Sequence, residues 1–170
     1  LYGNSGSDTI YGGGGNDILV ANDRYNDGAD DATVNAGDNL YGEAGDDSLY
    51  GTASDNILDG GTGADILYSG DGSDTIVLRS GDGGSALSNA DTITDFTDGT
   101  DVLGLDDGLL YSDLTIAQSG SDTVISITSS SEYLAILTGI TASNINYFDF
   151  ASMATGNQSF TGTTGDDVFI

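Results

Sequence analysis

A pattern of nine residues recurs along the sequence and can be written G-G-x-G-x-D-x-U-x, where U is a large aliphatic residue. Four copies follow one another in unbroken register from residue 42 to residue 77. Others lie at 3–11, 12–20 and 162–170, and degenerate copies lie at 33–41 and 86–94. A fixed short period restricts the fold to a stack of similar units, because so small a unit buries its apolar residue only against its neighbours.

Each copy divides into a turn, at positions one to six, and a short strand. Position eight carries the one aliphatic side chain expected to be buried, which is Ile10, Leu19, Leu40, Leu49, Leu58, Leu67, Ile76 or Ile93. Because side chains alternate along a strand, positions seven and nine should face solvent. Two copies, one on each side, complete a coil of eighteen residues. The sequence therefore predicts an all-β fold, a parallel β-roll of two sheets.

Position six of the turn is acidic in almost every copy, as Asp8, Asp17, Asp38, Asp47, Asp65, Asp74, Asp91 and Asp167. Coils stacked about 4.8 Å apart would bring these carboxylates into repulsive columns. The whole chain has 28 acidic and two basic residues, a formal net charge of −26. That charge excludes nucleic acid and anionic membrane surfaces as partners and calls for cations.

The available ligands indicate which cation. Carboxylates and turn carbonyls supply only oxygen, which suits calcium better than magnesium with its strict octahedral geometry. The chain has no His and no Cys, which disfavours zinc and copper and rules out disulfides. A single Asp-Gly turn would be an ordinary loop. The periodic array is what predicts several Ca²⁺ ions.

The repeats GGGGNDILV (12–20) and GGTGADILY (60–68) resemble the calcium-binding nonapeptides of the RTX (repeats-in-toxin) family. The resemblance implies that calcium lies between turns two repeats apart, held by position-six side chains and by carbonyls of positions one to four. It assigns carbonyl ligands to Gly3, Ser5, Gly6, Gly12, Gly13, Gly14, Gly15, Gly42, Glu43, Ala44, Gly45, Gly51, Thr52, Ala53, Gly60, Gly61, Thr62, Gly63, Gly70, Asp71 and Gly72. The best sites should pair Asp17 with Asp47 and Asp47 with Asp65. The other side should be weaker because Ser54 replaces Gly and Asn56 replaces Asp, although an amide oxygen can still act as a ligand.

The repeat region, residues 1–94, is interrupted twice. Residues 21–32 form an acidic insertion, expected to be a loop that bulges from the roll, with an additional metal site as the alternative. Residues 78–85 are a second excursion. The segment 89–105 resembles the end of RTX arrays exported by type I secretion, and it offers Asp91, Asp95, Asp98 and Asp101 as further candidate ligands.

Residues 95–155 are expected to form a non-repetitive β cap over the open end of the roll. LTIAQ, DTVISI and EYLAIL are separated by Gly/Ser turns, which predicts antiparallel strands, and 137–150 resembles the cap that follows RTX arrays. Residues 156–170 have two interpretations. DDVFI resembles the end of a type I secretion signal, and it also completes a nonapeptide that would begin another array. Leu1 is expected to begin a fragment, since no initiator Met or signal pattern precedes it.

Catalysis is not expected in this segment, because it lacks His and Cys and has only Arg24 and Arg79 as cations. No apolar run is long enough to cross a bilayer. Tyr50 and Tyr68 are eighteen residues apart and should lie on one outer face, where cross-strand stabilisation is the simpler role and polysaccharide binding the alternative. The sequence predicts a calcium-dependent folding module of a large secreted or cell-surface bacterial protein that passes through a type I secretion apparatus.

Overall fold

The computed structural model describes residues 1–3, 6–21 and 37–153. It contains strands and three short 3-10 helices, η1 (Leu87–Asn89), η2 (Tyr111–Asp113) and η3 (Tyr147–Asp149). The strands are β1 (Thr9–Gly14), β2 (Ile18–Val20), β3 (Asn39–Ala44), β4 (Ser48–Tyr50), β5 (Ile57–Asp59), β6 (Ile66–Tyr68), β7 (Thr75–Leu78), β8 (Asp91–Ile93), β9 (Val102–Leu105), β10 (Leu114–Ser119), β11 (Asp122–Ile127), β12 (Glu132–Leu137) and β13 (Phe150–Ser152). None of the described helices is long and apolar enough to span a membrane.

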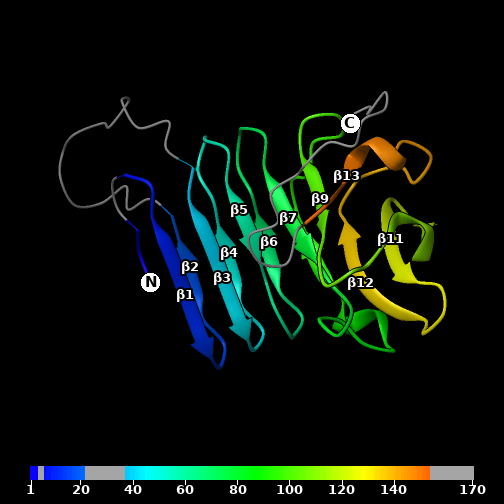
Figure 1. Ribbon diagram of the computed structural model, residues 1–170, viewed down its shortest axis with the longest axis horizontal. Coiled ribbons are helices and arrows are strands. Elements are labelled where there is room, and N and C mark those ends of the chain that lie inside the picture. The colour runs from blue at the N-terminus through cyan, green and yellow to red at the C-terminus, as the bar shows by residue number, and fades with distance from the viewer. Residues whose placement is uncertain (4–5, 22–36, 154–170) are drawn as a thin grey trace, which may run out of the picture.

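The strands form two sheets, and the chain alternates between them from β1 to β10 (Figure 1). The first sheet has the order β1-β3-β5-β7-β9-β13, and the second has the order β10-β11-β12-β8-β6-β4-β2. All pairs between repeat strands are parallel. Leu40 pairs with Leu58 in the first sheet, and Leu49 pairs with Leu67 in the second. In each pair the two residues are eighteen positions apart in the sequence. The predicted parallel β-roll is confirmed.

The two interruptions leave the coil register intact. Leu19 pairs with Leu49, an offset twelve residues longer than the usual coil, which is the length of the 21–32 insertion. Leu67 pairs with Ile93, an offset longer by the eight residues of the 78–85 excursion. Apart from Ala21, the insertion and its possible metal site lie outside the described residues.

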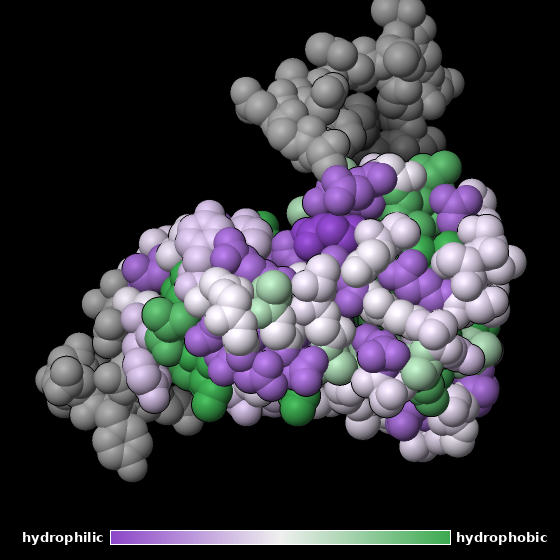
Figure 2. Space-filling model, turned by 90° about the horizontal axis from the view of Figure 1, so that it is seen from below, coloured by the Kyte–Doolittle hydropathy of each residue, from purple (hydrophilic) through white to green (hydrophobic). Residues whose placement is uncertain are grey.

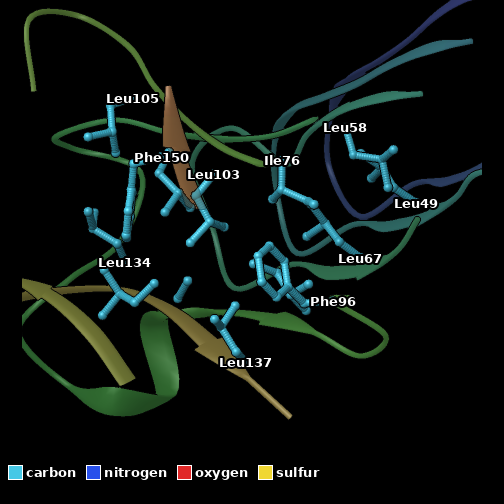
Figure 3. Close-up of a cluster of buried hydrophobic side chains, with 14 of the residues drawn as sticks. Leu49, Leu58, Leu67, Ile76, Phe96, Leu103, Leu105, Leu134, Leu137 and Phe150 are labelled. Atoms are coloured by element: carbon cyan, nitrogen blue, oxygen red, sulfur yellow. The ribbon is translucent and has the colours of Figure 1, made fainter. Parts of the chain in front are cut away.

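The core is a single file of aliphatic side chains between the sheets. All eight predicted position-eight residues are buried, and Leu19, Leu40, Leu49, Leu58, Leu67, Ile76 and Ile93 are 0% exposed. Figure 3 shows Leu49, Leu58, Leu67 and Ile76 from successive repeats, with Phe96 between these side chains and Leu137 of the cap. One such side chain per nine residues stabilises by about 1.5–3 kcal/mol. That is less than the cost of ordering nine residues at about 1–2 kcal/mol each.

Positions seven and nine lie on the outer faces, as predicted for Ile18, Tyr50, Ile66 and Tyr68, which are all exposed. Two position-nine residues depart from this pattern, because Asp59 and Val77 are buried. Asp59 binds Arg79. Val77 lies beside Gly104, over which the side chain of Met153 packs. The C-terminal part of the chain therefore covers part of the first sheet.

The cap continues both sheets. β10, β11 and β12 form the predicted antiparallel meander, and β12 then pairs in parallel with β8. β13 pairs in parallel with β9 in the first sheet. The proposed boundary between residues 94 and 95 lies in the connection from β8 to β9, and Leu134, Leu137 and Phe150 share one core with the repeats. Residues 156–170 and the repeat at 162–170 lie outside the described part of the chain.

Candidate calcium-binding turns

Position-six side chains connect each coil to the next in two ladders of hydrogen bonds. In every step, an Oδ1 atom accepts a hydrogen bond from the backbone N–H of the position-six residue in the preceding coil. The first ladder, beside the first sheet, consists of Asp8, Asp38, Asn56, Asp74 and Asp101, with N···O distances of 2.7–3.1 Å. The second ladder, beside the second sheet, consists of Asp17, Asp47, Asp65 and Asp91, with distances of 2.6, 2.7 and 3.0 Å. The two pairs predicted to be the best sites, Asp17–Asp47 and Asp47–Asp65, are thus brought together.

The second carboxylate oxygen has no partner in several of these residues. Among the described side chains, the Oδ2 atoms of Asp8, Asp47, Asp65 and Asp74 are buried and make no hydrogen bond. A buried polar atom without a partner costs about 1–3 kcal/mol, and more when it is charged. The same unpartnered atom occurs at four equivalent positions. This regularity indicates that a bound group, and not another part of the chain, is the partner of these four oxygens.

A backbone carbonyl oxygen lies close to two of these oxygens, Asp8 Oδ2 and Asp47 Oδ2. A Cβ placed on Gly42, which has none, would lie 2.5 Å from Asp47 Oδ2 and would also collide with the carbonyl oxygen of Gly60 in the next coil. Similarly, a Cβ on Gly3 would lie 2.9 Å from Asp8 Oδ2 and 2.6 Å from the carbonyl oxygen of Ala21. Two oxygen acceptors facing each other repel unless a cation lies between them, so these residues fit an oxygen-ligated ion.

The turns bring further carbonyls to each site. Positions two and four take positive φ, as at Gly13 (97°) and Gly15 (101°), a conformation open to glycine. Glu43 adopts it too, with φ of 74°, although it has a side chain. The carbonyl oxygens of positions two and four lie against the turn of the next coil. The Glu43 carbonyl oxygen lies against Gly61, and the Gly45 carbonyl oxygen lies against Gly63. The same geometry recurs between the turns at 51–54 and 70–72.

Side chains alone do not make these sites. In the part of the chain that the structure describes, no three acidic side chains are grouped closely enough to hold a metal ion. Any ion in the turns must therefore take most of its ligands from backbone carbonyls, with one or two carboxylates. This composition agrees with the ligand set that the nonapeptide pattern implies.

Burial raises the pKa values of six ladder carboxyl groups, those of Asp38, Asp47, Asp65, Asp74, Asp91 and Asp101. Burial, together with the charge of neighbouring Asp101, raises the pKa of Asp74 to about 6. The pKa values of Asp65 and Asp91 are also raised, chiefly by burial, with a further contribution from the charge of Asp47 on Asp65 and from the charge of Asp65 on Asp91. Burial is also the chief reason why the pKa values of Asp38, Asp47 and Asp101 are raised. Without a cation, the fold favours the protonated form of these groups.

The candidate ligands at 89–105 have different positions. Asp91 and Asp101 are the last members of the second and first ladders. Asp95 accepts hydrogen bonds from the backbone N–H groups of Ser69 and Gly70 and so caps a repeat turn. Asp98 is exposed, and its pKa is raised by partial desolvation and by the charge of Asp149. Ser5 and Asp167 lie outside the described residues.

A cluster around Arg79 was not foreseen from the sequence. Its guanidinium binds Asp59 with two hydrogen bonds and lies 3.5 Å from Asp82 and 3.6 Å from Asp106. Burial raises the pKa of Asp82 to about 7, despite the opposing effect of Arg79. The signal in the sequence was Asp59, an acidic residue at position nine, where the other strands carry Tyr or Val. The cluster joins the 78–85 excursion to the outer face of the first sheet.

The tyrosines at position nine form cross-strand pairs on both outer faces. Tyr50 is in register with Tyr68 on the second sheet, and both are exposed, by 42% and 48%. On the first sheet the rings of Tyr11 and Tyr41 are stacked, with centroids 5.0 Å apart.

Figure 2 shows another side of the molecule, seen from below, where hydrophilic residues are interspersed with residues of intermediate hydropathy.

Comparison with known proteins agrees with this geometry. A family model for the RTX calcium-binding nonapeptide repeat (4 copies) matches residues 1–23, 25–51, 33–67, 41–76 and 50–84. A search of curated proteins found no match.

Two solved structures share the fold. The crystal structure of the extracellular lipase LipA from Serratia marcescens is 23% identical, with a TM-score of 0.56 over 84% of this chain and 20% of the lipase. The solution structure of the AlgE6R3 subunit from the Azotobacter vinelandii mannuronan C5-epimerase is also 23% identical, with a TM-score of 0.53 over 98% of this chain and 94% of that subunit. The chain therefore corresponds to about a fifth of the lipase and to nearly the whole epimerase subunit.

Proposed function

Because residues 1–84 of this chain belong to the RTX calcium-binding nonapeptide repeat family, we propose that it is a calcium-binding structural module that folds when ions enter its turns. The observation that carries the proposal is the set of four buried, unpartnered Oδ2 atoms, on Asp8, Asp47, Asp65 and Asp74. Each belongs to a carboxylate whose other oxygen already links two coils. A calcium ion would supply the charge that these oxygens lack and would draw in the adjacent turn carbonyls.

Coupled binding and folding follows from the weak core. Burial of one aliphatic per repeat does not offset the ordering of a glycine-rich turn. Ions bound by the folded turns but not by the unfolded chain add their binding free energy to folding. The residues of the chain position the site. The Oδ1 atoms hold neighbouring coils in register, and the glycines let the turn carbonyls approach the ion.

The cellular setting belongs to the same proposal. A chain of net charge −26 stays unfolded where calcium is scarce and folds where calcium is millimolar. This behaviour suits a secreted or cell-surface protein that passes through a type I secretion apparatus unfolded. The similar lipase LipA is an extracellular enzyme, which supports this setting. We assign no reaction to the segment, which serves the parent protein as a structural module.

Calcium titration of the whole chain by isothermal calorimetry tests the proposal. The calcium-free protein should bind several ions with dissociation constants of about 10⁻⁴–10⁻³ M. Asp47→Asn should lose one ion or weaken binding about tenfold, because it removes a buried ligand charge. Asp107→Asn removes the same charge from an exposed position and should leave the titration unchanged. Equal effects of the two variants, or equally strong magnesium binding, would contradict calcium binding in the turns.

Polysaccharide binding is a second candidate function, favoured by the register and exposure of Tyr50 and Tyr68. Adjacent tyrosine rings on a flat sheet can stack on successive sugar rings. With calcium present, a neutral glucan should bind the wild type and should bind the Tyr50→Ala/Tyr68→Ala variant about tenfold more weakly. The same changes at Tyr11 and Tyr41 provide the control. If no glycan binds, the tyrosines stabilise the sheet only.

A further inference from the structure

Asn56 is the one neutral member of the two ladders. Its Oδ1 atom accepts the ladder hydrogen bond from Asp38 N–H at 3.0 Å, as the aspartates do, and a second from Thr52 Oγ1 at 3.3 Å. The first ladder therefore passes through this coil without a break. The side chain is only 1% exposed, so its other polar atom must also find partners inside the protein.

The Nδ2 atom of Asn56 has three such partners. It donates to the carbonyl oxygens of Ser54 (2.5 Å) and Ser69 (3.2 Å) and to Asp74 Oδ1 (3.1 Å). These oxygens come from its own turn and from the next coil. All the hydrogen-bonding atoms of Asn56 are satisfied, in contrast to the four aspartates with an unpartnered Oδ2.

This nitrogen occupies the place that Oδ2 has in the other turns. A Cβ on Gly51 would lie 3.0 Å from Asn56 Nδ2 and would collide with the Ser69 carbonyl oxygen, just as one on Gly42 would meet Asp47 Oδ2 and the Gly60 carbonyl oxygen. At Asp47 two acceptor oxygens lie close together, a repulsive contact that a bound cation would relieve. At Asn56 an N–H donor faces the carbonyl, so the contact is already favourable.

We propose that the side-chain amide of Asn56 takes the place of a calcium ion, so that the turn at 51–56 stacks on the turn at 69–74 without metal. The inference rests on the proposed calcium binding of the other turns, and it replaces the expectation that Asn56 is a ligand through its oxygen. Its consequence is a built-in calcium-independent step between β5 and β7, in the middle of the roll. That step gives the chain a local starting point from which calcium-bound coils extend in both directions.

The test is the number of ions bound by Asn56→Asp at saturating calcium, measured by equilibrium dialysis. Aspartate restores the unpartnered oxygen, so this variant should bind one ion more than the wild type. Its β structure, followed by circular dichroism, should also depend more steeply on calcium concentration. The Asp47→Asn variant is the matched reverse exchange on the second ladder and should bind one ion fewer.

An unchanged ion count in Asn56→Asp would overturn the inference, because it would mean that Asn56 already takes part in an occupied site. If that variant does not fold in calcium, the count for Asn56→Ala decides. A count equal to the wild type supports an ion-free turn, and a count lower by one contradicts it. The two proposals fail separately, because a wild-type chain that binds no calcium refutes the proposed function, whatever Asn56 does.

Discussion

Removing calcium should abolish most of the β structure of this chain at neutral pH. Four buried Oδ2 atoms would then lack any partner, and the ladder carboxylates would repel one another along the roll. At one hundred times its dissociation constant, a ligand stabilises the folded state by about 2.7 kcal/mol per site. A few such sites amount to the whole stability of an ordinary domain, about 5–15 kcal/mol. Far-UV circular dichroism in excess chelator, followed by readdition of calcium, measures the loss and its recovery.

Two controls separate ligation from charge screening. Sodium chloride at matched ionic strength screens exposed charges but does not coordinate the turn carbonyls, so it should restore little β structure. Magnesium should restore less than calcium because it requires strict octahedral geometry. A full β spectrum in excess chelator would show that the core and the ladders suffice, and would refute coupled binding and folding.

The same carboxylates determine how pH acts on the calcium-free chain. The pKa of Asp74 is raised to about 6 in the fold, and that of Asp65 is raised also, from about 3.9 in an unfolded chain. Folding therefore takes up protons, and the stability that this provides is complete below about pH 4 and is lost as pH rises through about 6. Without calcium, β structure should increase as pH falls from 8 to 5. A β signal that only decreases over this range would contradict the raised pKa values.

Gly42→Ala should disrupt the roll almost as severely as calcium removal. The added methyl group would lie 2.5 Å from Asp47 Oδ2 and would collide with the carbonyl oxygen of Gly60, so it would occupy the proposed ion site and push two coils apart. We expect the free energy of unfolding at saturating calcium to fall by about 3 kcal/mol, and the number of bound ions to fall by one. Urea denaturation and equilibrium dialysis measure the two effects.

Gly14→Ala is the matched control in another glycine-rich turn. Nothing lies within 4 Å of a Cβ at Gly14, and its φ is not in the left-handed region. It should therefore change the unfolding free energy by less than about 1 kcal/mol. If Gly42→Ala is as stable as Gly14→Ala, the close approach of oxygens at Gly42 is not part of a working site.

The sequence predicted the roll well because the information is periodic and local. A nine-residue repeat with one aliphatic at position eight identifies the buried residue of every repeat, and all eight predicted residues are buried. It also predicted the antiparallel meander from β10 to β12, since Gly/Ser turns separate three apolar runs. It did not predict that Asp59 would be buried on an outer face, because its partner Arg79 arrives from the following coil.

The sequence by itself determined the coil, its core and the row of acidic turns, because each of these depends on spacing within one or two repeats. Only the tertiary structure decided what each oxygen of those acids does. One carboxylate oxygen accepts a backbone N–H from the preceding coil, and the other is left facing a carbonyl. Likewise, the choice between an ion and the amide of Asn56 depends on where the Ser69 carbonyl and Asp74 lie in the next coil. Such contacts join residues thirteen or more positions apart, and the stacking of the coils fixes their geometry.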